Sequence, residues 1–344
     1  MNAAHQTIIN AIVEKAKKVC PDSLELIGVY GSVATGDVYE KSDLDLVLLI
    51  KDDEGRRLAT GFLLDDSGVG YDIYCTTHEA LEYDATCHHA KLSRLLDCKI
   101  VYAQNEDALA YLRALQSRAR ETLSSDERFA RVDALIGSAK RSFADALLRD
   151  AIGDVRRAVL FELTDLADAA MLFHGRYFQK GTKRMLSELR TLPRGDAFAD
   201  RIRAVVAAKT VSELREQARL LLLFAEAQFC RPLERSAPSA ALRGTYEEMF
   251  SNWRNKTEEA ARRGDGFSSF MNLGGLSAML ADIGAEVDVS VPDVFADYDP
   301  DDLWGNLRLY DGALDAYLGA YEAAGIAPLR YSTADDFARA YLAD

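Results

Sequence analysis

A pair of aspartates set between two strongly apolar segments constrains this chain more than any other feature. Residues 24–30 are mostly apolar and are followed directly by Gly31 and Ser32. Asp43 and Asp45 come just before a second apolar run. Such runs predict buried strands, and carboxylates two residues apart on a strand lie on the same face. Neighbouring carboxylates repel each other unless a cation lies between them, and oxygen ligands suit Mg²⁺. The small residues Gly31 and Ser32 let backbone N–H groups approach a phosphate closely. The sequence therefore predicts a phosphate-binding turn beside a metal-binding strand.

This order of residues resembles the nucleotidyltransferase superfamily of DNA polymerase β, whose pattern is a Gly-Ser turn, a short connection and Asp-x-Asp. The resemblance covers the N-terminal third of the chain. Members of the superfamily carry a third carboxylate on a neighbouring strand, and Asp72 stands at the matching position in the segment VGYDIYCTT. Alternation in that segment places Asp72 and Tyr74 on one face of a strand. The alternative is an ordinary Ser-Asp turn with an exposed carboxylate at a strand edge, but the apolar run after Asp45 favours a central strand.

The resemblance also implies a role for each of these residues. Asp43 and Asp45 are expected to hold two Mg²⁺ ions, which stabilise the attacking and leaving oxygens together. Asp72 is expected to bind the ion beside the attacking hydroxyl, or to help deprotonate that hydroxyl. Ser32 and the N–H groups around Gly31 are expected to hold the β- and γ-phosphates of ATP or another NTP.

The chain has 344 residues and a net charge of −14. This charge limits the classes of molecule that the protein is expected to bind. The acidic excess is concentrated in residues 1–103 and 236–344, whereas residues 121–235 are slightly basic. Binding of long nucleic acid requires a basic stripe, so acidic lobes disfavour DNA or RNA and favour a cationic small molecule. The five cysteines are odd in number and widely scattered, which predicts reduced thiols in a cytoplasm. The N-terminal helix lacks the features of a signal peptide, and we expect no membrane contact.

The pattern of elements predicts an α+β fold with three parts. Residues 1–104 alternate helix and strand, with strands expected at 24–30, 43–51, 69–76 and 98–103, and are expected to form the catalytic domain. Residues 105–235 have helical periodicity and are expected to assist in binding the substrate or the triphosphate. A linker at 231–242, rich in Pro and Ser, precedes an acidic and mostly helical unit, residues 240–344. No fixed-period repeat is evident.

Three carboxylates recur every three residues on the helix expected at 155–174: Glu162, Asp165 and Asp168. No Lys or Arg lies three or four residues from any of them, so the helix does not neutralise them itself. One interpretation is a solvated acidic face, or pairing with another helix. The other is that one member, with Glu162 favoured, faces the active-site cleft. There it would act as a general base, its pKa raised by its neighbours, or bind a cationic substrate.

A basic cluster follows this helix. Lys180, Lys183 and Arg184 surround Gly181, together with Arg176. Helical domains in the superfamily often lend a cation to the triphosphate, and the resemblance implies that role for this cluster. The alternative is solvent-facing charge at a helix boundary.

A small nucleotidyltransferase domain followed by helices also resembles the antibiotic nucleotidyltransferases of the kanamycin and lincosamide type, which confer antibiotic resistance. This implies transfer of AMP from ATP to a hydroxyl of a small molecule, with release of pyrophosphate. The acceptor is alternatively a protein side chain or a tRNA end, as in toxin-type relatives, although the acidic lobes disfavour tRNA. A protein that binds nucleotides without turnover is a further alternative, disfavoured because Asp43, Asp45 and Asp72 are all present.

Overall fold

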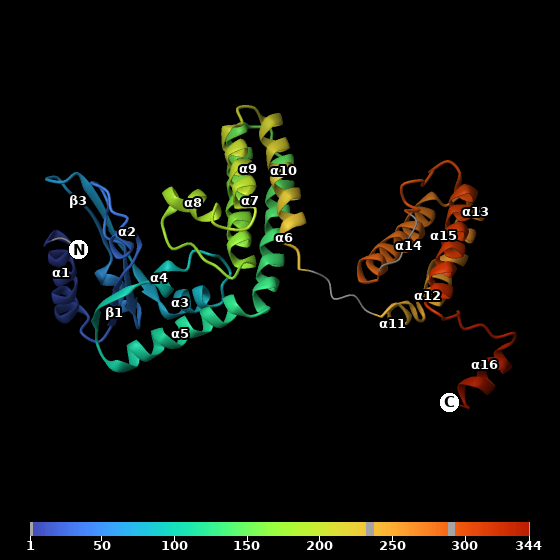
Figure 1. The fold of residues 1–344 in the computed structure, drawn as a ribbon, viewed down its shortest axis with the longest axis horizontal. Coiled ribbons are helices and arrows are strands. Elements are labelled where there is room, and N and C mark those ends of the chain that lie inside the picture. The colour runs from blue at the N-terminus through green and yellow to red at the C-terminus, as the bar shows by residue number, and fades with distance from the viewer. Residues whose placement is uncertain (1–2, 232–236, 288–292, 344) are drawn as a thin grey trace. The chain divides into compact units, whose positions relative to one another are not determined.

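The computed structural model describes residues 3–231, 237–287 and 293–343, and the chain divides into two compact units at residues 231 and 232. The first unit contains a small mixed sheet followed by helices, and the second is helical (Figure 1). This confirms the predicted α+β fold. Residues 1–104 and most of 105–235 lie together in the first unit. The predicted linker lies partly outside the described residues.

A four-stranded sheet forms the centre of the N-terminal region, with the strand order β5-β2-β1-β6. β1 (Leu24–Val29) pairs antiparallel with β2 (Leu46–Ile50) and with β6 (Lys99–Ala103), and β2 pairs parallel with β5 (Cys75–Thr77). All five residues of β2 are buried, as expected for a central strand covered on both faces. β2 is shorter than predicted, so Asp43 and Asp45 precede the strand.

Two layers cover the sheet, and the residues of β2 alternate between them. Leu46 and Leu48 face a core shared with α1 (Ala3–Val19) and with a hairpin of β3 (Thr60–Leu64) and β4 (Val69–Ile73). Val47 and Leu49 face a second core that continues through the helices as far as Phe229. This continuous core explains why the predicted boundary at residue 104 lies inside one compact unit.

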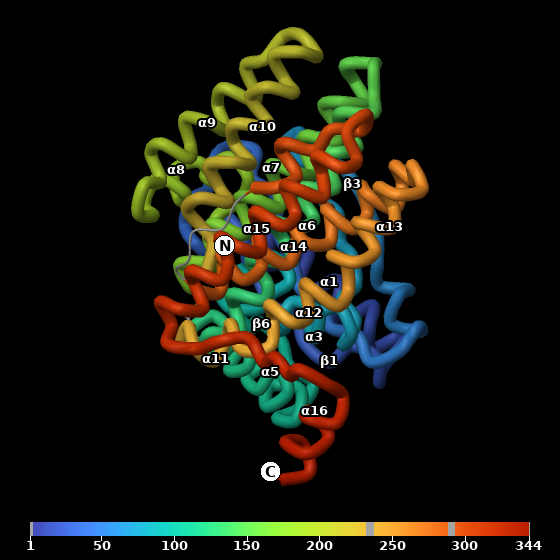
Figure 2. Tube along the Cα trace, turned by 90° about the vertical axis from the view of Figure 1, so that its right-hand side faces the viewer, coloured from blue at the N-terminus to red at the C-terminus, as the bar shows by residue number. Residues whose placement is uncertain are grey.

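Helices α3 (His78–Ala85), α4 (Ser93–Leu96) and α5 (Glu106–Ser124) join the sheet to a bundle. The bundle consists of α6 (Glu127–Leu147), α7 (Ile152–Phe173), α9 (Gly195–Ala207) and α10 (Val211–Gln228), which run alongside one another (Figures 1 and 2). The short η2 (Thr182–Arg184) and α8 (Met185–Leu189) lie between α7 and α9. Thr210 begins α10 with a capping box, in which its hydroxyl accepts from the N–H of Glu213 at 3.2 Å. Thr77 caps α3, where its hydroxyl accepts from the N–H of Ala80 at 3.2 Å.

The second unit has its own core, built around the buried side chains of Tyr310, Tyr317 and Tyr321. Its helices are α11 (Pro238–Leu242), α12 (Thr245–Met249), α13 (Asn255–Arg263), α14 (Gly266–Glu286), α15 (Leu303–Ala323) and α16 (Ala334–Tyr341), with a π-helical turn, η3 (Phe250–Arg254), between α12 and α13. None of the helices in the described ranges is both long and apolar enough to cross a membrane.

Candidate active site

The end of β1 forms a tight turn that only glycine can make. Gly31 has a φ of +64° and begins the short helix α2 (Gly31–Thr35). A Cβ atom at position 31 would lie 1.9 Å from Oδ2 of Asp45. The missing side chain therefore lets the Asp45 carboxylate pack directly on the turn, where it accepts a hydrogen bond from the backbone N–H of Ser32.

Asp43 and Asp45 act on each other electrostatically, as the sequence predicts for a pair on one face. Asp43 is exposed and Asp45 is half-buried, with the buried Leu44 between them. The backbone N–H of Tyr30 donates to the carbonyl of Asp45 at 3.1 Å, which fixes this segment against the end of β1. Burial, and next the charge of Asp43, raise the pKa of Asp45 to about 6, although the bond from Ser32 opposes this.

Asp72 lies on β4, as an exposed carboxylate between the buried Tyr71 and Ile73. The predicted alternation is therefore present. However, β4 belongs to the separate two-stranded hairpin, so the third carboxylate does not come from a strand of the main sheet. Asp72 and Asp43 line one open hollow of about 410 Å³, which we call the hairpin hollow. Gly61, Phe62, Leu63, Gly70 and Tyr71 complete its lining.

A second hollow opens on the Asp45 side of the pair and is called here the lysine hollow. It has a volume of about 190 Å³ and extends from the Gly31 turn to the segment before α8. Two cationic side chains, Lys91 and Lys180, line it together with Asp45. The remaining lining residues are Tyr30, Gly31, Ser93, Phe178, Gly181, Thr182 and Met185.

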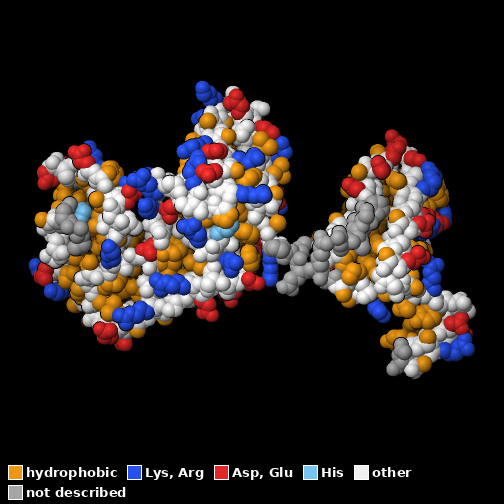
Figure 3. Space-filling view, in the orientation of Figure 1, with side chains coloured by type: hydrophobic (Ala, Val, Ile, Leu, Met, Phe, Trp, Pro, Cys, Tyr) orange, Lys and Arg blue, Asp and Glu red, His pale blue; other side chains and the backbone are white. Residues whose placement is uncertain are grey.

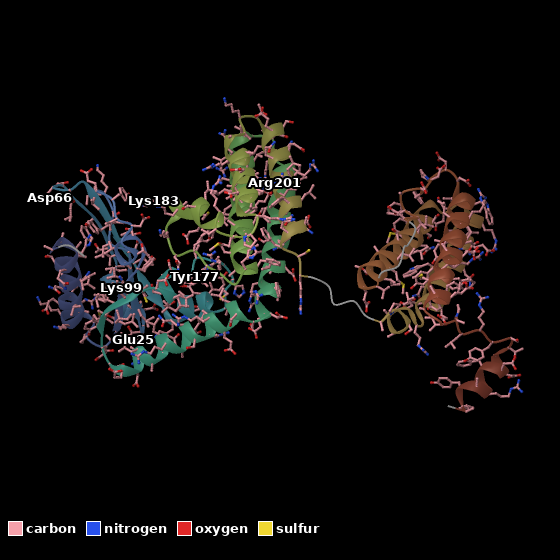
Figure 4. All side chains as sticks on the ribbon, viewed as in Figure 1. Glu25, Asp66, Lys99, Tyr177, Lys183 and Arg201 are labelled. Atoms are coloured by element: carbon pink, nitrogen blue, oxygen red, sulfur yellow. The ribbon has the colours of Figure 1, made fainter. Side chains whose placement is uncertain are left out.

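Three of the four residues of the predicted basic cluster, Lys180, Lys183 and Arg184, lie in two different environments. Lys180 lines the lysine hollow, and its backbone N–H donates to the Glu188 carboxylate at 3.0 Å. Arg184 instead makes a two-point contact with Asp37, just after α2, at 2.8 and 2.9 Å. Lys183 donates to the carbonyl of Asp37 at 3.1 Å. Lys and Arg side chains gather on this face between the hairpin and α8, where Lys183 points (Figures 3 and 4).

The paired residues have a structural task. Because Asp37 comes just after α2, its ion pairs attach the segment before α8 to the end of that short helix. The two nearby cations hold the pKa of Asp37 at about 2, well below its usual range, chiefly through the hydrogen bond from Arg184. Of the predicted cluster, Lys180 is thus the cation that faces the hollow.

Glu162, Asp165 and Asp168 of α7 are called here the carboxylate ladder. Glu162 and Asp168 are buried, and Asp165 is partly buried. The ladder as a whole is therefore not a solvated acidic face. Glu162 is fully buried, neither carboxylate oxygen has a hydrogen-bond partner among the described residues, and the side chain lines neither hollow. Burial raises its pKa to about 8. Mutual repulsion along the ladder, the predicted cause, is not what raises it.

Asp168 is the member of the ladder connected to the site. Its carboxylate, 3% exposed, accepts a hydrogen bond from the backbone N–H of Ala90. The carbonyl of Ala90 accepts from the N–H of Phe178 at 2.8 Å, so this segment is held from both sides. The next residue, Lys91, acts electrostatically on Asp168 and lines the lysine hollow. Sequence reasoning missed Lys91, because it stands in a short irregular segment without periodicity.

The donor set fits a divalent cation that the substrate helps to bind. Within the described part of the chain, no three His, Cys, Asp or Glu side chains are gathered closely enough to hold an ion. Asp43 and Asp45 are nevertheless paired, and both offer oxygen ligands. Mg²⁺ is usually bound by one or two carboxylates together with substrate phosphates, rather than by a complete protein cage. Asp43 and Asp45 suit that arrangement, whereas Asp72 lines the hairpin hollow with Asp43 but not with Asp45.

Two comparisons with known proteins found a match, one with a family model and one with solved structures. Residues 9–111 match the family model described as a nucleotidyltransferase domain, which confirms the prediction for the N-terminal region. A solved structure, a nucleotidyltransferase-like protein from Exiguobacterium sibiricum, is 16% identical, with a TM-score of 0.36, and the match covers 82% of this chain and 92% of that one. No curated protein sequence matches.

Proposed function

We propose that the nucleotidyltransferase domain of residues 9–111 transfers a nucleoside monophosphate, in first place AMP from ATP, to a hydroxyl group of a small cationic molecule. One observation carries the proposal: the Asp43–Asp45 pair separates two hollows of opposite charge. Two lysines line the hollow on the Asp45 side, whereas two carboxylates and no cation line the hollow on the Asp43 side. An anionic triphosphate and a cationic acceptor therefore have complementary places on either side of the pair.

The lysine hollow receives the phosphates of the NTP. Its volume of about 190 Å³ is below the ~300–1,000 Å³ typical of sites for whole small molecules, so only part of the nucleotide lies there. Lys91 and Lys180 neutralise phosphate charge, and the backbone of Gly31 and Ser32 offers N–H donors. Asp168 is a positioning residue in this account, because it holds the backbone that carries Lys91.

Asp43 and Asp45 would hold the divalent ions, which would neutralise charge on the transferred phosphoryl group and the leaving pyrophosphate. The acceptor oxygen attacks the α-phosphorus, and the bond from that phosphorus to the bridging oxygen of the β-phosphate breaks. Asp72, on the acceptor side, takes the proton of the attacking hydroxyl. The exposed side chain of Leu63, which lies on the same face of the hairpin as Asp72, offers an apolar contact to the acceptor.

An acceptor screen tests the proposal. The protein is incubated with each labelled NTP and Mg²⁺, and with matched panels of hydroxylated acceptors: aminoglycosides and lincosamides as cations, and neutral sugars as controls. We expect pyrophosphate release with ATP and a cationic acceptor, and a product heavier by one AMP. Labelling of polypeptide without small-molecule product would replace this acceptor class with a protein, and turnover with neutral sugars alone would contradict the electrostatic argument.

A further inference from the structure

A buried ion pair joins α3 to α4. Asp84, near the end of α3, is fully buried, and Arg94 of α4 binds it at two points, with Nε donating to Oδ2 at 2.5 Å and Nη2 donating to Oδ1 at 2.9 Å. Neither side chain lines the lysine hollow or the hairpin hollow. A buried carboxylate is tolerated when it is paired in this way. Any effect of Asp84 on the active site must therefore pass through its neighbours.

His89 connects Asp84 to one wall of the lysine hollow. Its Nε2 atom lies 3.3 Å from Oδ1 of Asp84, and its Nδ1 atom accepts a hydrogen bond from the backbone N–H of Lys91 at 3.2 Å. A neutral imidazole has one donor and one acceptor nitrogen, so these two contacts assign the proton to Nε2. The side chain of Lys91 lines the lysine hollow. We call this connection, from Asp84 through His89 to Lys91, the histidine arm.

A second connection starts from the same ion pair. Arg94 also donates to the hydroxyl of Tyr74, and the hydroxyl oxygens of Tyr74 and Tyr30 are 2.6 Å apart. Tyr30 stands between β1 and the Gly31 turn and lines the lysine hollow. We call this connection, from Asp84 through Arg94 and Tyr74 to Tyr30, the tyrosine arm.

The two arms therefore lead from one buried carboxylate to two residues of the same hollow. Burial alone would raise the pKa of Asp84, but the hydrogen bonds from His89 and Arg94 hold it below its usual value, so the carboxylate stays ionised as an acceptor for both arms. Tyr30 and Lys91 both lie outside helices and strands. Regular backbone pairing does not order their side chains, and the arms supply contacts that do.

We propose that Asp84 is a positioning residue of the nucleotide site, which orders Lys91 through the histidine arm and Tyr30 through the tyrosine arm before the phosphates bind. Binding costs less free energy when the groups that contact a ligand are already ordered. The inference rests on the proposed function, because that function places the phosphates in the lysine hollow. Asp84 does not touch the nucleotide, so its contribution is to nucleotide affinity rather than to the chemical step.

Calorimetric titration of the full chain with ATP in Mg²⁺ tests this role. Removal of Asp84 would leave the Arg94 charge without its partner and could unfold the protein, so each arm is cut at a later member. His89→Phe and Tyr74→Phe both keep an aromatic ring and remove the polar atoms of the arm. Each should weaken ATP binding by about three- to tenfold, the range expected for a lost hydrogen bond. In steady-state assays each should raise the KM for ATP more than it lowers kcat.

Two neighbouring residues give matched controls. His88→Phe makes the same change next to His89, but His88 contacts Thr86 and Tyr83 rather than Asp84. Tyr83→Phe removes an exposed hydroxyl one residue before Asp84 and keeps the ring that stacks on His88 at 4.8 Å. Both controls should bind ATP as the wild type does.

A double-mutant cycle separates positioning from a general loss of stability. In a Lys91→Met background, His89→Phe should have no further effect on ATP binding, because the histidine arm ends at Lys91. Tyr74→Phe should keep its full effect in that background, since it belongs to the other arm. A purely structural role would weaken binding equally with and without Lys91→Met.

The outcomes distinguish this inference from the proposed function. A wild type that binds ATP, together with unchanged affinity in His89→Phe and Tyr74→Phe, would overturn the inference alone. Equal losses in the two controls, or a full additional loss when His89→Phe is combined with Lys91→Met, would do the same. A folded wild type that binds no NTP in Mg²⁺ would overturn the proposed function, and this inference with it.

Discussion

Gly31 and Asp45 pack so closely that a Cβ atom at position 31 would lie 1.9 Å from the carboxylate. The carboxylate occupies the space that a side chain at position 31 would need, and it binds the N–H of Ser32. The turn predicted to bind phosphate and the Asp45 carboxylate predicted to bind metal are therefore one hydrogen-bonded unit. A change at either residue is expected to disturb both functions.

Gly31→Ala should abolish transfer, because its methyl group must displace Asp45. Gly36→Ala is a matched control: its φ of +77° is equally unfavourable for alanine, yet no atom lies within 4 Å of its Cβ position. Both variants should lose about 1 kcal/mol of stability from backbone strain. Urea unfolding and steady-state rates would separate the two effects. Equal activity in the two variants would mean that the contact with Asp45 is not required.

Glu162→Gln should flatten the pH dependence of stability. Burial raises the pKa of Glu162 in the folded state to about 8, above its pKa in the unfolded chain. Between these two pKa values the folded state binds more protons than the unfolded state does. The wild type therefore loses this contribution as pH rises toward 8, and the variant does not. The difference in free energy of unfolding should favour the variant by about 1–3 kcal/mol more at pH 8 than at pH 5. A constant difference would mean that Glu162 is ionised at both pH values.

At the scale of elements, the sequence predicts what depends on local pattern. β1, α7 and the capping box at Thr210 follow from apolar runs, helical periodicity and spacing. β3 was not predicted, because its residues alternate weakly and its partner, β4, becomes evident only from pairing. The Asp43–Asp45 pair could be identified from spacing, whereas Lys91 could not, since it is placed by tertiary contacts that the preceding Ala90 makes with Asp168 and Phe178.

The basic turn before α8 offers a test at this scale. Lys180→Met should raise the KM for NTP by about tenfold, because it removes a cation that faces the phosphates. Lys183→Met removes the same charge three residues away, where the ammonium contacts Asp37 and the Tyr39 ring. Its effect on KM should be clearly smaller. A larger effect of Lys183→Met would assign the phosphate contact to the other end of the turn.

At the scale of the molecule, the total charge of −14 conceals a useful separation of charge. The first unit places lysines on one side of the Asp43–Asp45 pair and carboxylates on the other. Composition predicts an acidic protein that avoids long nucleic acid, but only the fold shows which side of the pair is basic. The second unit has a separate core. It also has a polar groove beside α13 and α14, and the sequence pattern did not indicate this groove.

Pyrophosphate release by Asp45→Asn tests the central claim most directly. The variant is compared with wild type and with Asp66→Asn, an equal change at the exposed end of the hairpin (Figure 4), in Mg²⁺ and in EDTA. We expect wild type and Asp66→Asn to release pyrophosphate in Mg²⁺ alone, and Asp45→Asn to lose at least about 10²-fold in rate while its circular dichroism spectrum is unchanged. Release at the wild-type rate by a folded Asp45→Asn, or undiminished release in EDTA, would contradict the account.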